Sequence, residues 1–209
     1  MHSGRTWLSM ANNVKKIYGV IGYPVKHSLS PAMHNAAFKY LNINAEYKLF
    51  EVRPEELEDF LLKDILIKDI NGGSVSTYDI SGFNITIPHK IKAKEILERG
   101  FPFNQDVPQI QQDLYYVKLS GAVNTVKREG NVLRYWNTDA SGFLKSLEED
   151  LEFKTKGKNV LLIGCGGAGR AVIAALSWKN VEIKKIYITD INEETMNSAK
   201  EHFSLIPQA

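Results

Sequence analysis

Apolar residues follow two different spacings along this chain, and the two alternate. Short runs rich in β-branched residues predict strands at 16–21, 46–52 and 82–87. Apolar residues three or four positions apart predict helices at 31–41, 54–65 and 90–97. This order predicts an α/β domain built on an open, mostly parallel sheet with helices on both faces.

The next part of the chain continues the pattern with shorter elements. Two short strands are predicted at 121–126 and 132–136, and the turn Glu129-Gly130-Asn131 joins them into a hairpin. Such a hairpin makes the predicted sheet mixed. A helix with an apolar stripe is predicted from Asp139 to Leu151, and a linker containing Lys and Gly follows it.

We expect four segments from this organisation. Residues 1–13 are interpreted as a tag or leader outside the fold, because they lack the apolar stretch and cleavage pattern of a secretory signal. Residues 14–138 are predicted to form the first domain, and 139–153 a connecting helix. Residues 154–209 are predicted to be the first part of a Rossmann domain, which is incomplete because only one crossover is present.

A glycine-rich loop in this last segment predicts a dinucleotide site. The run 158–163 is a predicted buried strand, and a helix is predicted to follow the loop. The loop residues expected to contact a dinucleotide are Gly164, Gly166, Gly167, Ala168 and Gly169. Glycines here permit a tight turn, a close approach of backbone to pyrophosphate, and packing of helix on strand.

Asp190 follows the next apolar run, at 186–189, where a carboxylate suits the free hydroxyls of a ribose. It would also repel a 2′-phosphate, so the sequence predicts a preference for NAD, with NADP as the alternative. Two other interpretations stay open: Asp190 caps the following helix, or Lys184 or Lys185 reaches a phosphate.

Composition narrows the classes of function. The chain has 209 residues, 44% of them hydrophobic and 24% charged, with a net charge of +2. Its lysines are dispersed, so no nucleic-acid partner is predicted. No apolar run is long enough to span a bilayer, so no membrane partner is expected. Cys165 is the only cysteine and cannot form an intrachain disulfide, which favours a cytoplasmic location.

Two serines precede the first predicted helix. Ser30 is predicted to be the N-cap, with Pro31 at the first helical position and Ser28 just upstream. Their hydroxyls and the helix dipole suit a carboxylate, although an N-cap role alone would also explain Ser30. No metal site is predicted, since His27 and His34 have no third ligand at metal spacing.

Further candidates follow the predicted strands. Thr86 and Lys90 lie near the carboxyl end of one strand, where open α/β sheets bind ligands. A lysine there can act as an acid or base, or it can simply be a solvated residue of the first helical turn. Asn124 offers an amide to a hydroxyl, and Asp139 is either a functional carboxylate or the N-cap of its helix.

Five motifs in this order resemble the signatures of the shikimate dehydrogenase family over residues 16–198. They are Gly19–Asn35, Gly82–Lys90, Gly121–Thr125, Asn137–Asp139 with Gly142-Phe143, and Gly164–Ala168. The resemblance implies an NAD(P)-dependent oxidoreductase of aromatic amino-acid biosynthesis that interconverts 3-dehydroshikimate and shikimate. Its first domain would bind the substrate.

The resemblance also implies roles for single residues. Those assigned to the substrate are Ser28 and Ser30 for its carboxylate, and Thr86, Asn124 and Asp139 for its ring hydroxyls. Lys90 and Asp139 would form the catalytic pair for proton transfer. Members that use NADP usually carry Asn-Arg-Thr where this chain has Asp190-Ile191-Asn192, so the arginine that faces a 2′-phosphate is absent.

The second half of a dinucleotide-binding domain and the C-terminal helix of the family are missing from this sequence. We therefore expect a piece of a longer protein, or a shortened relative that binds ligand without catalysis. Quinate and aminoshikimate dehydrogenases are further alternatives. Oligomeric state is not predicted.

Overall fold

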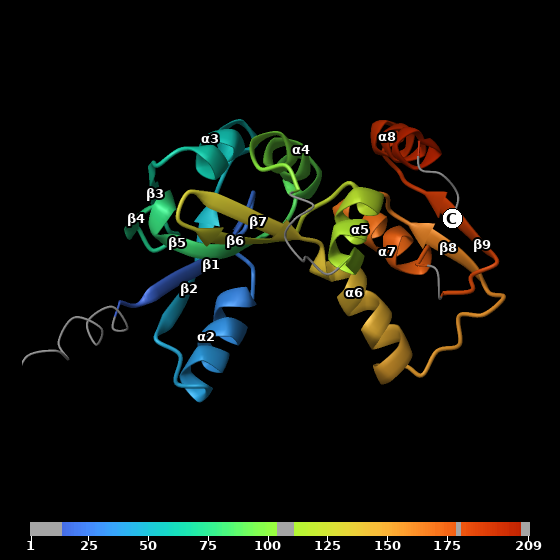
Figure 1. Ribbon diagram of the computed structural model, residues 1–209, viewed down its shortest axis with the longest axis horizontal. Coiled ribbons are helices and arrows are strands. Elements are labelled where there is room, and N and C mark those ends of the chain that lie inside the picture. The colour runs from blue at the N-terminus through green and yellow to red at the C-terminus, as the bar shows by residue number, and fades with distance from the viewer. Residues whose placement is uncertain (1–13, 104–110, 179–180, 206–209) are drawn as a thin grey trace, which may run out of the picture. The chain divides into compact units, whose positions relative to one another are not determined.

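The computed structural model describes residues 14–103, 111–178 and 181–205 (Figure 1). The predicted leader at 1–13 lies outside the described residues. The described residues divide into two compact units, one formed by those within 14–89 and 126–134 and the other by those within 90–125 and 135–205. The domain boundaries expected from the sequence stay a prediction.

The first unit is built on a five-stranded sheet in the order β2-β1-β5-β6-β7. Its strands are β1 (Lys16–Gly22), β2 (Ala45–Glu51), β5 (Ile80–Ile85), β6 (Thr125–Glu129) and β7 (Val132–Trp136). β1 lies between β2 and β5 and is parallel to both. β6 and β7 are joined by a short turn in which Gly130 has φ +61°, a conformation that glycine adopts without strain. The predicted α/β class with a mixed, mostly parallel sheet is confirmed.

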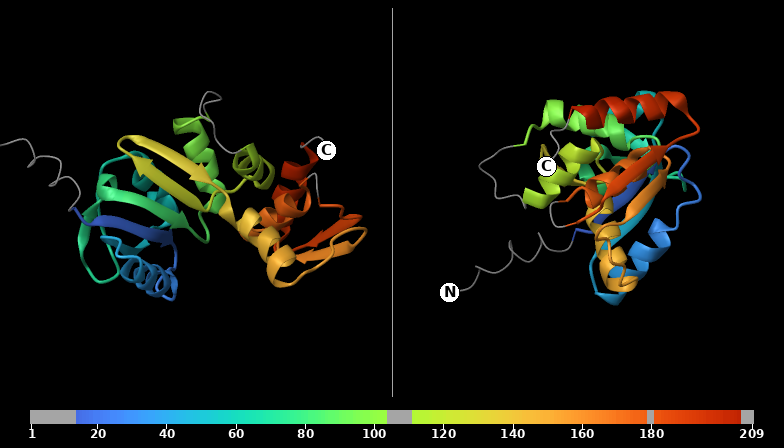
Figure 2. Two further views of the ribbon diagram at one scale, coloured as in Figure 1. Left: turned by 60° about the horizontal axis from the view of Figure 1, so that its bottom comes forward. Right: turned by 90° about the vertical axis from the view of Figure 1, so that its right-hand side faces the viewer.

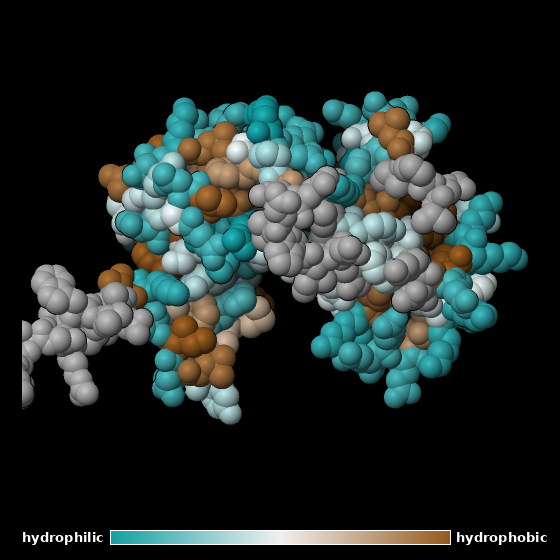
Figure 3. Space-filling model, in the orientation of Figure 1, coloured by the Kyte–Doolittle hydropathy of each residue, from teal (hydrophilic) through white to brown (hydrophobic). Residues whose placement is uncertain are grey.

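Helices cover both faces of this sheet (Figure 1). Phe38 of α2 (Ser30–Tyr40) packs on one face, against a cluster that contains Tyr18, Val20 and Tyr47. On the other face, Phe60 of α3 (Leu57–Leu62) meets Phe83 edge-on, with ring centroids 5.1 Å apart. The outer side of α2 is apolar, which Figure 3 shows as brown surface.

A small hairpin was not predicted from the sequence. It consists of β3 (Leu66–Lys68) and β4 (Ser74–Ser76), which pair antiparallel. Short 3₁₀ turns flank this region, η1 (Pro54–Glu56) before α3 and η2 (Thr77–Asp79) before β5. The sequence gives no strand signal here, because each strand has three residues and no apolar alternation.

The second unit contains five helices and a pair of strands among its described residues. They are α4 (Lys90–Gly100), α5 (Gln111–Ser120), α6 (Thr138–Lys145) with the π-helical turn η3 (Ser146–Asp150), β8 (Asn159–Ile163), α7 (Gly167–Leu176), β9 (Lys185–Thr189) and α8 (Glu193–Ser204). α5 was not predicted. The core joins residues from three helices, among them Tyr116, Leu144 and Ala174.

β8 and β9 are parallel neighbours, as the predicted βαβ unit requires. α7 covers one face of the pair, where Val160 and Ile186 pack into the core (Figure 2). Strand residues alternate between faces, so Leu161 and Ile163 point to the other side and are 65% and 76% exposed. No helix in the described part of the chain combines the length and apolarity needed to cross a membrane.

Candidate active site

An ion pair between two predicted site residues forms the centre of the candidate site. Lys90 is the first residue of α4, and Asp139 is the second residue of α6. The Lys90 Nζ atom lies 2.6 Å from Asp139 Oδ2. The lysine side chain is 15% exposed and that of Asp139 33%, so the pair is largely shielded from solvent, with part of the carboxylate accessible. Lys90 is therefore not the solvated residue that the alternative interpretation described.

Asn137 explains why the Asp139 carboxylate is available. The Asn137 Oδ1 atom accepts the Ala140 N–H at 3.2 Å and so caps α6. Its amide nitrogen donates to Ser120 Oγ at 2.9 Å and to the Ala122 carbonyl at 3.0 Å, which fixes this fully buried side chain. The interpretation of Asp139 as the N-cap is wrong, because Asn137 takes that role.

Asn124 orients the same carboxylate from a third segment. Its Nδ2 atom donates to Asp139 Oδ1 at 2.7 Å and to Thr138 Oγ1 at 2.9 Å. Its Oδ1 atom accepts the Thr138 N–H at 2.8 Å. One residue earlier, the Val123 N–H donates to the Lys90 carbonyl at 2.9 Å. The structure thus brings Lys90, Asn124 and Asp139 together and holds their backbones in one network.

The glycine-rich loop contacts this site directly, which the sequence did not predict. A Cβ atom built on Gly167 would lie 2.8 Å from the Lys90 Cβ and 3.0 Å from its Cδ. Any larger residue would have to displace the lysine stem. Gly167 is consequently needed for the position of Lys90.

The glycine-rich loop also has two features that suit an anion. Gly164 has φ +104°, and a Cβ atom at Gly164 or Gly166 would meet nothing within 4 Å, so the backbone is open to an approaching group. α7 begins at Gly167, and its first N–H groups and positive dipole end favour an anion there. Ala168 and Gly169 lie in the same first turn of the helix.

Asp190 holds this loop in place. Its Oδ2 atom accepts the Cys165 N–H at 2.6 Å, and its Oδ1 atom accepts the Asn192 N–H at 2.9 Å. These two hydrogen bonds keep the pKa of the carboxyl group below its usual value. Asn192 caps α8 by accepting the Thr195 N–H at 2.9 Å, so the interpretation of Asp190 as that cap is wrong.

The two lysines considered for a phosphate do not lie beside Asp190. Lys184 precedes β9 and Lys185 begins it, whereas Asp190 follows its last residue. The Lys185 ammonium lies 4.9 Å from the centre of the Tyr187 ring. Because a strand rises about 3.3 Å per residue, roughly 16 Å of backbone separates Lys185 from Asp190.

The other predicted substrate residues belong to the first unit. Ser28 Oγ lies 3.1 Å from Ser30 Oγ and accepts the Ser30 N–H at 3.3 Å, so the two serines are adjacent. Leu29 rather than Ser30 occupies the N-cap position of α2, so the predicted capping role of Ser30 is wrong. Thr86 follows β5, where its N–H donates to the Ile21 carbonyl at 2.9 Å.

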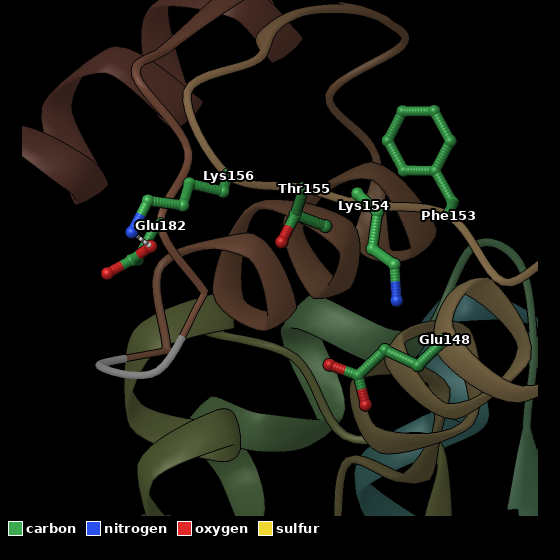
Figure 4. Close-up of a pocket in the computed structure, with 6 residues that line it drawn as sticks. All are labelled: Glu148, Phe153, Lys154, Thr155, Lys156 and Glu182. Carbon is green, nitrogen blue, oxygen red and sulfur yellow. Dashed lines mark ion pairs between the residues drawn. The ribbon is translucent and has the colours of Figure 1, made fainter.

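A shallow surface hollow of about 340 Å³ lies elsewhere in the second unit (Figure 4). It is lined by Glu148, Phe153, Lys154, Thr155, Lys156 and Glu182. Lys156 and Glu182 form an exposed ion pair across it at 2.8 Å. The hollow shares no residue with the Lys90 site, and solvated charges of this kind are ordinary surface features. The Lys90 network therefore remains the candidate site.

Comparison with known proteins agrees with this geometry. Residues 20–126 match the family of the shikimate dehydrogenase substrate binding domain. The chain belongs to the shikimate dehydrogenase family. A shikimate dehydrogenase (NADP(+)) from Geobacter metallireducens is 41% identical over 162 residues, which are 78% of this chain and 48% of that protein. The chain spans about half the length of the curated relatives it matches.

Solved shikimate dehydrogenases share the fold. The structure from Aquifex aeolicus has a TM-score of 0.65 and 36% identity, and the match covers 91% of this chain and 61% of that one. A structure from Thermus thermophilus in complex with NADP(H) and shikimate has a TM-score of 0.62 and 30% identity. That match covers 92% of this chain and 63% of the Thermus chain.

The preference for NAD predicted from Asp190 is wrong. The curated shikimate dehydrogenases that match this chain are named as NADP(+) enzymes, and the Thermus structure contains NADP(H). The structure supplies a physical reason for the error. Both Asp190 oxygens accept backbone N–H groups, so this carboxylate has a structural role that does not depend on ribose hydroxyls.

Proposed function

We propose that this chain is part of an NADP(H)-dependent oxidoreductase that interconverts 3-dehydroshikimate and shikimate. The observation that supports this most directly is the Lys90–Asp139 ion pair, held by Asn124 and in contact with the glycine-rich loop. The names of the relatives supply the substrate and the cofactor. A role in aromatic amino-acid biosynthesis and a cytoplasmic location follow from the same proposal.

The reduction of a carbonyl leaves negative charge on its oxygen in the transition state. The Lys90 ammonium is the donor that stabilises this oxygen and gives it a proton. Asp139 accepts a hydrogen bond from Lys90, which fixes the direction in which the remaining ammonium protons point. NADP(H), when bound, supplies or accepts the hydride.

Substrate binding is proposed for five side chains. Ser28 and Ser30 bind the carboxylate, since adjacent hydroxyls at the start of α2 can both donate to it. Thr86, Asn124 and Asp139 bind the ring hydroxyls.

The cofactor is proposed to lie with its pyrophosphate on the loop formed by Gly164, Gly166, Gly167, Ala168 and Gly169. Open space at Gly164 and Gly166 and the start of α7 support this position. Asp190 contributes by holding the Cys165 N–H and thereby the shape of the loop.

Substitution of Lys90 tests the function. We expect Lys90→Ala to lower kcat by about 10²- to 10⁴-fold, with a smaller change in KM, because the proton donor is lost while the proposed substrate contacts of other residues remain. Lys92→Ala is the matched control, since Lys92 lies in the same helix and pairs with exposed Glu95.

The measurement is NADP(H)-dependent turnover with 3-dehydroshikimate or shikimate. A kcat in the Lys90→Ala variant equal to that of the Lys92→Ala variant would remove Lys90 from the mechanism. Shikimate binding without cofactor-dependent turnover in the unsubstituted protein would instead favour a ligand-binding protein that lacks catalysis.

A further inference from the structure

A buried tyrosine connects two elements of the first unit that carry proposed substrate residues. Tyr47 lies in β2, and only 5% of its surface is exposed. Burial raises the pKa of its hydroxyl group, so the group stays protonated and can donate a hydrogen bond at any physiological pH. The ring packs in the cluster between α2 and the sheet.

One side of this connection leads to α2. The Asn35 Nδ2 atom donates to the Tyr47 carbonyl at 3.0 Å, and the Tyr47 N–H donates to Asn35 Oδ1 at 2.8 Å. His34 stacks on the Tyr47 ring, with centroids 4.2 Å apart and planes inclined by 16°. These contacts fix the position of α2 along its axis and its rotation about that axis. Ser30 lies four residues before His34 and so occupies the same side of the helix.

The other side leads to β5. The Tyr47 hydroxyl donates to Asn84 Oδ1 at 2.6 Å. β1 lies between β2 and β5, with Tyr18 opposite Tyr47 and Val20 opposite Asn84, so the tyrosine side chain reaches across a whole strand. Thr86 lies two residues after Asn84, which places both side chains on the same face of the extended backbone.

We propose that Tyr47 is a positioning residue that sets the spacing between Ser30 and Thr86. This inference rests on the proposed function, in which Ser30 binds the substrate carboxylate and Thr86 a ring hydroxyl. The substrate is a rigid ring, so the distance between its carboxylate and its hydroxyls is fixed. A protein that must bind both ends at once needs an equally fixed spacing, which the Asn35, Tyr47 and Asn84 contacts provide.

The test compares two ligands on each variant. Shikimate uses both ends of the site, whereas cyclohex-1-enecarboxylate has the same ring and carboxylate and lacks the hydroxyls. Tyr47→Phe removes only the hydroxyl that reaches Asn84. Tyr18→Phe is the matched control, because Tyr18 belongs to the same cluster and its ring packs on Phe38. Dissociation constants are measured by ligand-observed NMR below the melting temperature of each variant.

We expect Tyr47→Phe to weaken shikimate binding by about five- to tenfold, the equivalent of one net hydrogen bond, and to leave cyclohex-1-enecarboxylate unchanged. In turnover assays KM for shikimate should rise while kcat and KM for NADP(H) stay near their original values. Tyr18→Phe should leave the dissociation constants of both ligands unchanged.

Equal weakening of both ligands in Tyr47→Phe would indicate a general structural role and overturn the proposal. Unchanged shikimate binding, or the same loss in Tyr18→Phe, would overturn it as well. Failure of the unsubstituted protein to bind shikimate at all would overturn the proposed function and this inference with it, and is distinguishable because no variant is needed to observe it.

Discussion

At the scale of single residues, Asp190 has a structural role in the glycine-rich loop. Its two carboxylate oxygens accept the backbone N–H groups of Cys165 and Asn192. We expect Asp190→Asn to lower the affinities for NADP(H) and NAD(H) by a similar factor, because the amide has one acceptor oxygen where the carboxylate uses two. Fluorescence titration with each cofactor measures both affinities.

Glu193→Gln is the control for that experiment. It removes a charge from the first turn of α8 and leaves the Asp190 contacts intact. We expect neither cofactor affinity to change in Glu193→Gln. Unchanged affinities in Asp190→Asn would show that the two hydrogen bonds of Asp190 are not needed to hold the loop.

The sequence identified Lys90, Asn124 and Asp139 as candidates, yet Lys90 and Asp139 each had an equally simple structural explanation. Asn137 and Asp139 are both good N-cap residues two positions apart. What decides between them is the buried hydrogen bonding of Asn137 to Ser120 and Ala122, which depends on a distant segment. Local spacing therefore cannot settle which carboxylate or amide is free for chemistry.

At the scale of elements, the cap of α6 is expected to matter more than an ordinary cap. Asn137→Ala removes the Ala140 cap and also leaves Ser120 Oγ and the Ala122 carbonyl without this donor. We expect a loss of about 3 kcal/mol in the free energy of unfolding, measured by urea denaturation. Asn192→Ala removes only the exposed cap of α8 and should cost about 1 kcal/mol. Equal losses would contradict the proposed organising role of Asn137.

The β3–β4 hairpin is expected to depend on pH through Asp69. Burial raises the pKa of this carboxyl group, but hydrogen bonds from Lys48 and from the N–H groups of Gly73 and Asn71 outweigh it, so the pKa is lowered overall. A lowered pKa contributes stability above the unfolded value of about 3.9, and the contribution disappears as the pH falls through the folded value.

We therefore expect Asp69→Asn to cost about 1–2 kcal/mol at pH 7 and progressively less below about pH 4. Urea denaturation at pH 7 and at about pH 3 measures how much free energy of unfolding the variant loses at each pH. Asp59→Asn is the control, because its pair with Lys63 is exposed and should contribute less than about 0.5 kcal/mol. A loss in Asp69→Asn that is the same at pH 3 and pH 7 would contradict this assignment.

The longer elements were predictable because the spacing of apolar residues indicates the type and approximate bounds of an element. β1, β5, α2 and α4 agree with the sequence to within a few residues. The β3–β4 hairpin and α5 were missed for different reasons. The hairpin has three-residue strands whose turn is organised by buried Asp69, and α5 begins with polar residues that give no amphipathic pattern.

At the scale of the whole molecule, the β8–β9 pair has one face without cover among the described residues. Leu161, Ile163 and Tyr187 are 65%, 76% and 49% exposed on it. Parallel strands are normally covered on both faces, because both carry apolar side chains. The match to this chain covers about half the length of each of the curated relatives compared above, so the covering layer in them need not come from the part that matches.

This face gives the last prediction. We expect the 209-residue chain to associate with itself as its concentration rises. The double variant Leu161→Thr, Ile163→Thr should raise the concentration needed for association about tenfold or more, because less apolar area is buried between copies. Light scattering after size-exclusion chromatography measures this across a dilution series. The control is Val132→Thr, which changes an apolar residue that is 51% exposed on β7. It should leave the concentration needed for association unchanged. A monomer at every concentration would show that exposure of this face does not drive association. An equal shift from Val132→Thr would mean that any loss of surface apolar area has the same effect, and that the β8–β9 face is not the contact.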